Sequence, residues 1–141
     1  PALRAIAAAY PDGQTSRLVN PAVASLFERD PHVGAIIQYK DADRTIAGRL
    51  RLSRTIKSER FTTAILLQNA FDAAFIAWLA AIGQRIGYKR DGRGLLLTKG
   101  IAVTTDTLRL HHSHYYLNML KSAGFHAPYR LPWIYLTTDE R

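Results

Sequence analysis

Two adjacent apolar segments in the middle of the chain constrain the fold most. Residues 61–67 form a nearly continuous apolar run, which is typical of a β-strand covered on both faces. Residues 70–82 then place apolar side chains around almost a whole helical circumference, so we expect a buried helix there. Its aromatic side chains Phe71, Phe75 and Trp78 are predicted to belong to the core. A covered strand followed by a buried helix favours a layered α/β architecture.

Strand-like and helix-like patterns alternate along the rest of the chain. The predicted helices cover residues 1–10, 21–29, 43–60 and 108–123, and the other predicted strands cover residues 17–20, 33–39 and 84–88. Gly124 directly follows the last predicted helix, where many helices end with a glycine in the left-handed backbone conformation. The short connections between these segments favour a parallel sheet flanked by helices.

The amino-acid composition excludes several classes of function for this chain. The 141 residues provide one domain with a core of its own, since 48% of them are hydrophobic. There is no cysteine, which excludes disulfide frameworks and thiolate metal sites. The longest apolar run, residues 73–82, is too short to cross a bilayer. A net charge of +8 predicts a polyanionic partner: nucleic acid, an anionic membrane surface or a phosphorylated ligand.

The most informative loop is basic and rich in glycine. Between two apolar segments, residues 85–98 carry Lys89, Arg90 and Arg93 among three glycines. Glycine lets the backbone approach a ligand closely, and arginine can bind a phosphate or carboxylate through two parallel hydrogen bonds. The loop therefore fits an anion site, although a solvated turn of this composition is the other interpretation that the residues allow.

Five segments in register resemble the ADP-heptose:lipopolysaccharide heptosyltransferases, which form glycosyltransferase family 9. The segments are PALRAIAAAYPD, LVNPAVASLFERDPHV, SERFTTAILLQNAF, RIGYKRDGRGLLLT, and finally His111 with Tyr116, Leu117 and Leu120. The resemblance covers residues 1–126. It implies a Rossmann-like α/β domain on the acceptor side of a two-domain (GT-B) enzyme. Residues 127–141 would then be an interdomain linker or tail.

The resemblance also implies an activity. Family members transfer heptose from ADP-heptose directly, with inversion, to the lipid A–Kdo inner core of lipopolysaccharide, without a metal or cofactor. The family's aspartate base precedes the first helix and its nucleotide-sugar domain follows this one, and neither is in this sequence. We therefore expect no catalysis by the chain alone, and a cytoplasmic location, with peripheral contact at the inner membrane as a further expectation. The alternative function is a non-catalytic binding module for anionic glycolipid or nucleic acid.

Ligands of open α/β sheets bind beyond the carboxyl ends of the strands, which selects the candidate site. The predicted acceptor-binding residues are Asn20, Lys40, Asn69, Lys89, Arg90 and Arg93. For Asn69, a role as a simple helix N-cap is the competing interpretation. For Lys89, Arg90 and Arg93, the resemblance implies contact with the phosphates and sugar carboxylates of the inner core.

Three histidines in the last predicted helix, His111, His112 and His114, do not have the i, i+4 spacing that brings two ligands to one metal. We therefore expect no metal site. The many basic residues of segment 43–60 predict a solvated face, or alternatively a face that touches a membrane surface.

The resemblance has a structural consequence for the sheet. Family members begin with a central strand ahead of residue 1, and without it the two neighbouring strands have unpaired edges. We expect either a strand-exchanged homodimer or occupation of the gap by residues 129–138, which include the strand-like Trp133–Leu136.

Overall fold

The computed structural model describes residues 1–11, 13 and 15–132. Five helices, five strands and three short 3-10 helices make up this part of the chain. In chain order they are α1 (Ala2–Ala9), β1 (Thr15–Val19), η1 (Pro21–Leu26), β2 (Val33–Gln38), η2 (Asp41–Arg44), α2 (Ile46–Ser58), β3 (Thr63–Leu66), α3 (Phe71–Leu79), β4 (Gln84–Tyr88), η3 (Arg93–Leu96), β5 (Lys99–Ile101), α4 (Thr105–Arg109) and α5 (His112–Ser122).

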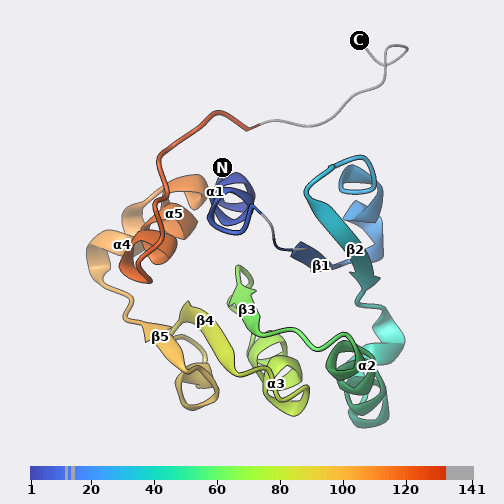
Figure 1. Cartoon of the computed structure of the whole chain (residues 1–141). Helices are drawn as coiled ribbons and strands as arrows, with labels where there is room; N and C mark the ends of the chain where they lie inside the picture. The colour runs from blue at the N-terminus through green and yellow to red at the C-terminus, as the bar shows by residue number, and fades with distance from the viewer. Residues whose placement is uncertain (12, 14, 133–141) are drawn as a thin grey trace.

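The strands form two separate parallel sheets. β1 pairs with β2, and β3, β4 and β5 form a three-stranded sheet in that order. Figure 1 shows the edge of β1 facing the edge of β3 across a gap, with α1 beside it. Both facing strands pair on one side alone among the described residues, as the sequence analysis predicts. The parallel α/β architecture is confirmed.

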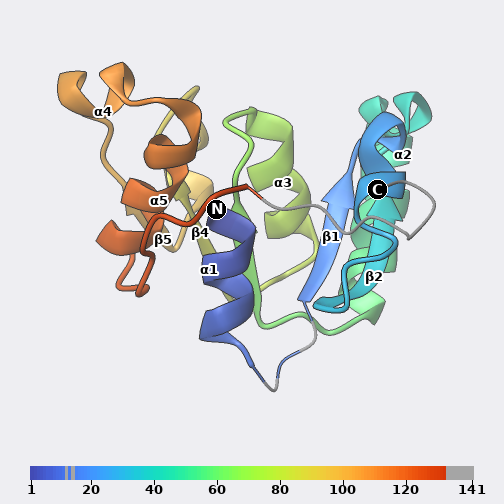
Figure 2. The ribbon, with the colours of Figure 1, turned by 90° about the horizontal axis from the view of Figure 1, so that it is seen from above.

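Helices cover the three-stranded sheet on both faces (Figures 1 and 2). On one face, α1 and α5 form a core with the buried side chains of Ile6, Tyr88 and Leu117. On the other face, α2 and α3 form a second core around Leu52 and Ile76. Parallel strands need this double cover because both of their faces carry apolar side chains.

The predicted helix over residues 108–123 is instead two helices. α4 ends at Arg109, and the imidazole Nδ1 of His111 accepts a hydrogen bond from the backbone N–H of Ser113 to begin α5. Gly124 ends α5 in the left-handed region (φ 93°), as predicted. The strand β5 was not predicted.

The prediction that the aromatic residues of α3 lie in the core is wrong. The helix buries its small side chains and Ile76, while Phe71 and Trp78 remain 44% and 48% exposed. The rings of Phe71, Phe75 and Trp78 stack along the surface at centroid distances of 5.8 and 5.9 Å.

Only part of the segment predicted to occupy the gap, residues 129–138, is among the described residues. Residues 129–132 are in no strand, and Tyr129 and Leu131 are exposed. Residues 133–138 lie outside the described residues. In the described chain, no helix has both the length and the apolarity needed to cross a bilayer.

Candidate functional site

Arg93 joins the carboxyl ends of β3 and β4. Its side chain is fully buried, at 0% exposure. The guanidinium Nε donates to the carbonyl of Tyr88 at 2.9 Å, and NH1 donates to the carbonyls of Gln68 and Ala70. NH2 donates to the Oδ1 of Asn69 at 3.3 Å. All four acceptors are uncharged oxygens, so a positive charge is held directly beneath the strand tips, and burial lowers the pKa of Arg93 from its ordinary value.

A sharp turn directs Arg93 inward. Asp91 and Gly92 both have left-handed backbone conformations, with φ of 51° and 75°, and they reverse the chain immediately before η3. The expectation that Arg93 presents its guanidinium to a ligand therefore does not match the structure. Its buried hydrogen bonds instead position the two strand tips.

Tyr115 of α5 lies between this buried arginine and the half-buried Arg90. Asn69 donates from its Nδ2 to the Tyr115 hydroxyl at 3.2 Å, while its Oδ1 accepts from Arg93. The guanidinium of Arg90 also interacts with the nearby Tyr115 hydroxyl, and this interaction raises the pKa of Arg90. Asn69 is not the N-cap of α3, a position held by Ala70, so the competing interpretation for Asn69 is wrong.

One ring contact and one hydrogen bond to its backbone hold Tyr115 against Tyr88. It packs on Tyr88 at a centroid distance of 4.4 Å, and the Tyr88 hydroxyl donates to the Tyr115 carbonyl at 2.7 Å. Burial raises the pKa of Tyr88. Neither tyrosine was among the predicted site residues, because a tyrosine in an apolar segment predicts core packing.

In the basic loop, Lys89 is exposed and Arg90 is half-buried. The aliphatic stem of Lys89 lies across Gly100, where an added Cβ would stand 2.7 Å from the lysine Cε. A glycine in β5 thus makes room for the lysine stem, and the backbone N–H of Lys89 bonds the carbonyl of Ile101 at 2.8 Å. The loop presents two cationic side chains on a well-anchored backbone.

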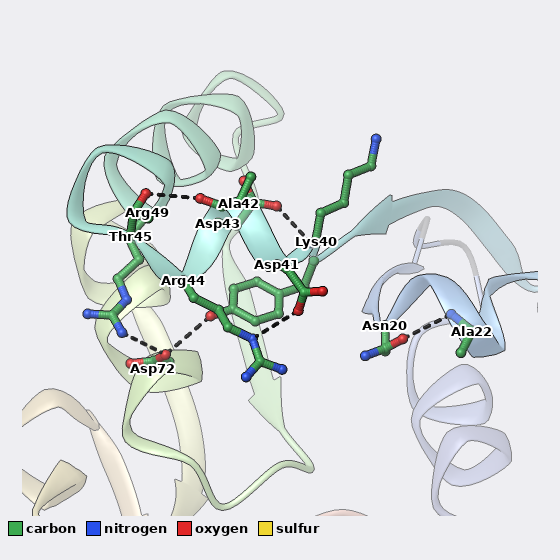
Figure 3. A network of polar contacts seen from close by, with 11 residues as sticks. Asn20, Ala22, Lys40, Asp41, Ala42, Asp43, Arg44, Thr45, Arg49 and Asp72 are labelled. Atoms are coloured by element: carbon green, nitrogen blue, oxygen red, sulfur yellow. Dashed lines mark hydrogen bonds and ion pairs between the residues drawn. The ribbon is translucent and has the colours of Figure 1, made fainter.

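A second polar cluster lies beside the carboxyl end of β2. Asp72 of α3 accepts from the NH2 of Arg49 at 2.9 Å and from the hydroxyl of Tyr39 at 3.2 Å (Figure 3). Partial burial, and next the hydrogen bond to Asp72, raises the pKa of Tyr39. The one sequence signal for this cluster is a single carboxylate in an otherwise apolar helix.

Asn20 and Lys40 lie on the β1–β2 side of the molecule and make local contacts. Asn20 caps η1 by accepting from the backbone N–H of Ala22 at 2.9 Å. The backbone N–H of Lys40 donates to the buried carboxylate of Asp43 at 2.8 Å, and the lysine side chain extends away from its neighbours in Figure 3. The six predicted residues thus form two groups: Asn69, Lys89, Arg90 and Arg93 come together, while Asn20 and Lys40 stand apart.

A hollow of about 320 Å³ lies at the opposite end of the strands. Its lining includes Thr15 and Val33, the first residues of β1 and β2, so it is remote from the strand tips. In the part of the chain that the structure describes, no three His, Asp or Glu side chains are grouped to hold a metal ion. The ring of His114 instead stacks on Tyr129 at 4.7 Å.

Comparisons with known proteins agree with this architecture. A model of glycosyltransferase family 9 (heptosyltransferase) matches residues 49–141. The E. coli ADP-heptose lps heptosyltransferase II has a similar structure, with a TM-score of 0.77 and 21% sequence identity over 96% of this chain. The chain spans 41% of the length of that structure. No curated protein sequence matches the chain.

Proposed function

Because the chain belongs to glycosyltransferase family 9, we propose that it is the acceptor-binding domain of a heptosyltransferase. The observation that carries this proposal is the cationic pair of exposed Lys89 and half-buried Arg90, held at the carboxyl ends of parallel strands by the buried Arg93. Open α/β sheets bind their ligands at this edge. The similar E. coli structure is of an ADP-heptose heptosyltransferase.

The charges of the loop fit an anionic sugar. The buried guanidinium of Arg93 contacts neutral oxygens, so its charge adds to those of Arg90 and Lys89 above it. On this proposal the nearby Tyr115 hydroxyl, whose interaction with Arg90 raises the pKa of this arginine, orients the guanidinium and lowers the entropic cost of binding a phosphate or carboxylate. We propose that the acceptor is the lipid A–Kdo inner core, whose phosphates and carboxylates these groups would bind.

The donor half of the reaction is proposed from the family. The nucleotide sugar would be bound by parts of a longer enzyme that correspond to the unmatched length of the E. coli structure. The acceptor hydroxyl, once deprotonated by a base, would attack the anomeric carbon as ADP leaves, giving inversion in one step. On this proposal, the present chain contributes acceptor recognition.

Calorimetric titration with a Kdo-containing inner-core saccharide tests the proposal. We expect the double variant Lys89→Ala/Arg90→Ala to bind at least about tenfold more weakly than the unaltered chain, because each lost charge-assisted hydrogen bond contributes roughly 1.5–3 kcal/mol. Arg109→Ala is the matched control, since Arg109 is also exposed but lies on α4.

Single-stranded RNA serves as the comparison ligand. Salt-sensitive RNA binding without any saccharide binding would overturn the proposal in favour of a nucleic-acid module. Equal saccharide binding by the double variant and the control would also contradict it.

A further inference from the structure

A side-chain amide without a protein partner stands at the tip of β3. Gln68 lies two residues beyond the end of that strand and is exposed. Its side chain makes no hydrogen bond or ion pair with any residue that the structure describes. The amide of the adjacent Asn69 is already engaged, because its Oδ1 accepts from Arg93 and its Nδ2 donates to Tyr115. Of these two neighbouring amides, Gln68 is therefore the one that is available to a ligand.

The backbone that carries Gln68 is held in place. The NH1 of Arg93 donates to the carbonyls of Gln68 and Ala70, and its NH2 donates to the side chain of Asn69 between them. One buried guanidinium thus binds three successive residues of the β3–α3 connection. On binding a ligand, Gln68 would order its own side chain and little else, and a preorganised backbone lowers the entropic cost of binding.

Gln68 also lies close to the cationic group of the candidate site. The Tyr115 hydroxyl accepts from Asn69 at 3.2 Å and interacts with the guanidinium of Arg90. Arg90 is thereby kept beside the tip of β3, which lies between the gap and β4 (Figure 1). A phosphate or carboxylate bound by Arg90 would have Gln68 as a neighbour on the side toward the gap.

The carboxylates on the two sides of the basic loop differ in their partners. On the β5 side, the chain continues into α4, whose first turn carries the exposed Asp106. On the β3 side, the carboxylate of Asp72 is paired with Arg49 at 2.9 Å. An anionic saccharide of several rings, bound at the loop by one charged group, is therefore repelled less when it extends over the β3 side and Gln68.

We propose that Gln68 is a specificity-determining residue of the acceptor site and binds a neutral hydroxyl of the sugar beside the anionic group. This inference rests on the proposed function and deepens it. An amide offers both a donor and an acceptor, which complement a hydroxyl, whereas Lys89 and Arg90 offer donors alone. Lys89 and Arg90 thus select for negative charge, and Gln68 distinguishes a saccharide from other anions of similar charge.

Calorimetric titration of the full chain with two ligands tests this division. One ligand is the Kdo-containing inner-core saccharide, and the other is inorganic pyrophosphate, which carries negative charge and no sugar hydroxyl. Gln68→Ala should weaken saccharide binding about fivefold, as expected for a lost neutral hydrogen bond, and leave pyrophosphate binding within about twofold. Lys89→Ala/Arg90→Ala should weaken the binding of both ligands. The melting temperature of Gln68→Ala should not change, because the backbone carbonyl that Arg93 binds is retained.

Gln38→Ala is the matched control, since Gln38 is also an exposed glutamine at the carboxyl end of a strand but belongs to β2, across the gap. It should bind the saccharide as the unaltered chain does. Equal saccharide affinities of Gln68→Ala and Gln38→Ala, with binding lost in Lys89→Ala/Arg90→Ala, would overturn this inference and leave the proposed function standing. Equal weakening of both ligands by Gln68→Ala would also overturn it. No saccharide binding by the unaltered chain would overturn the proposed function and this inference together.

Discussion

The two sides of the gap are built differently. On the β3–β4–β5 side, the tips of the strands are joined by the buried guanidinium of Arg93, and β4 buries Ile86 and Tyr88 almost completely. On the β1–β2 side, β2 has no buried residue, and polar groups at its tips mostly cap their own turns. We infer that the first side is a rigid scaffold for the exposed loop, whereas the second depends on packing through α2.

The largest expected difference is between alanine substitutions at Arg93 and at Arg90, which are three residues apart in one loop. Arg93→Ala should lower the free energy of unfolding by about 3 kcal/mol, since several buried oxygens lose their donor. That loss corresponds to a melting temperature roughly 10 °C lower. Arg90→Ala should leave the free energy of unfolding nearly unchanged. Thermal melts measure both variants, and equal melting temperatures would contradict the structural role assigned to Arg93.

Alanine substitutions at Gly48 and Gly100 add one methyl group on each side of the gap and compare how tightly the two sides are packed. A Cβ on Gly48 would stand 2.1 Å from the carbonyl oxygen of Ala42, which belongs to the backbone and cannot move alone. Gly48→Ala should therefore cost about 2 kcal/mol in urea unfolding. Gly100→Ala meets only the flexible stem of Lys89 and should cost clearly less. The opposite order would contradict the packing of α2 on η2.

Asp43 should give the β1–β2 side a pH dependence. The backbone N–H of Lys40 first, and then Arg51, holds the pKa of this carboxyl below its ordinary value. A depressed folded-state pKa means that the stabilisation is present above about pH 4 and is lost as the pH falls through the folded value. Asp43→Asn should remove about 1 kcal/mol at pH 7 and flatten the stability profile below pH 5. An unchanged acid limb in melts from pH 3 to 7 would exclude this role.

The smallest expected effect on stability comes from removing the Tyr115 hydroxyl. This substitution tests whether the hydroxyl positions Arg90 and does not merely stabilise the fold. Tyr115→Phe keeps the ring on Tyr88 and should cost no more than about 1 kcal/mol. It should nevertheless weaken saccharide binding severalfold, because Arg90 loses the hydroxyl that orients it. Tyr116→Phe is the control, and calorimetry measures both. Equal affinities would mean that Arg90 needs no support from α5.

Much of the fold could be predicted because strand burial leaves a clear pattern. The strand β4 has the predicted limits, and the interruption between β1 and β3 was expected. The helix α3 shows where the pattern fails. Since nearly all of its residues are apolar, no polar side indicates which side chains face outward, and the packing of small residues inward exposes Phe71 and Trp78. The strand-exchanged dimer across the gap stays a prediction.

The site was less predictable than the fold. Sequence identified the basic loop, but it could not tell which arginine points inward, because that depends on two left-handed residues at Asp91 and Gly92. The contacts of Asn69 with Tyr115 join residues 46 positions apart, and no local pattern contains them. Asn20 and Lys40 share the strand-end position with the others and yet make local contacts, because the gap separates the two sides.

The most direct test is a map of amide chemical shifts as the inner-core saccharide is titrated into the labelled chain. If the loop at the tips of β3 and β4 is the acceptor site, the largest shifts should fall on residues 88–94 and on Asn69, with Asn20 nearly unchanged. Shifts confined to the hollow at the amino ends of β1 and β2, around Thr15 and Val33, would contradict the account.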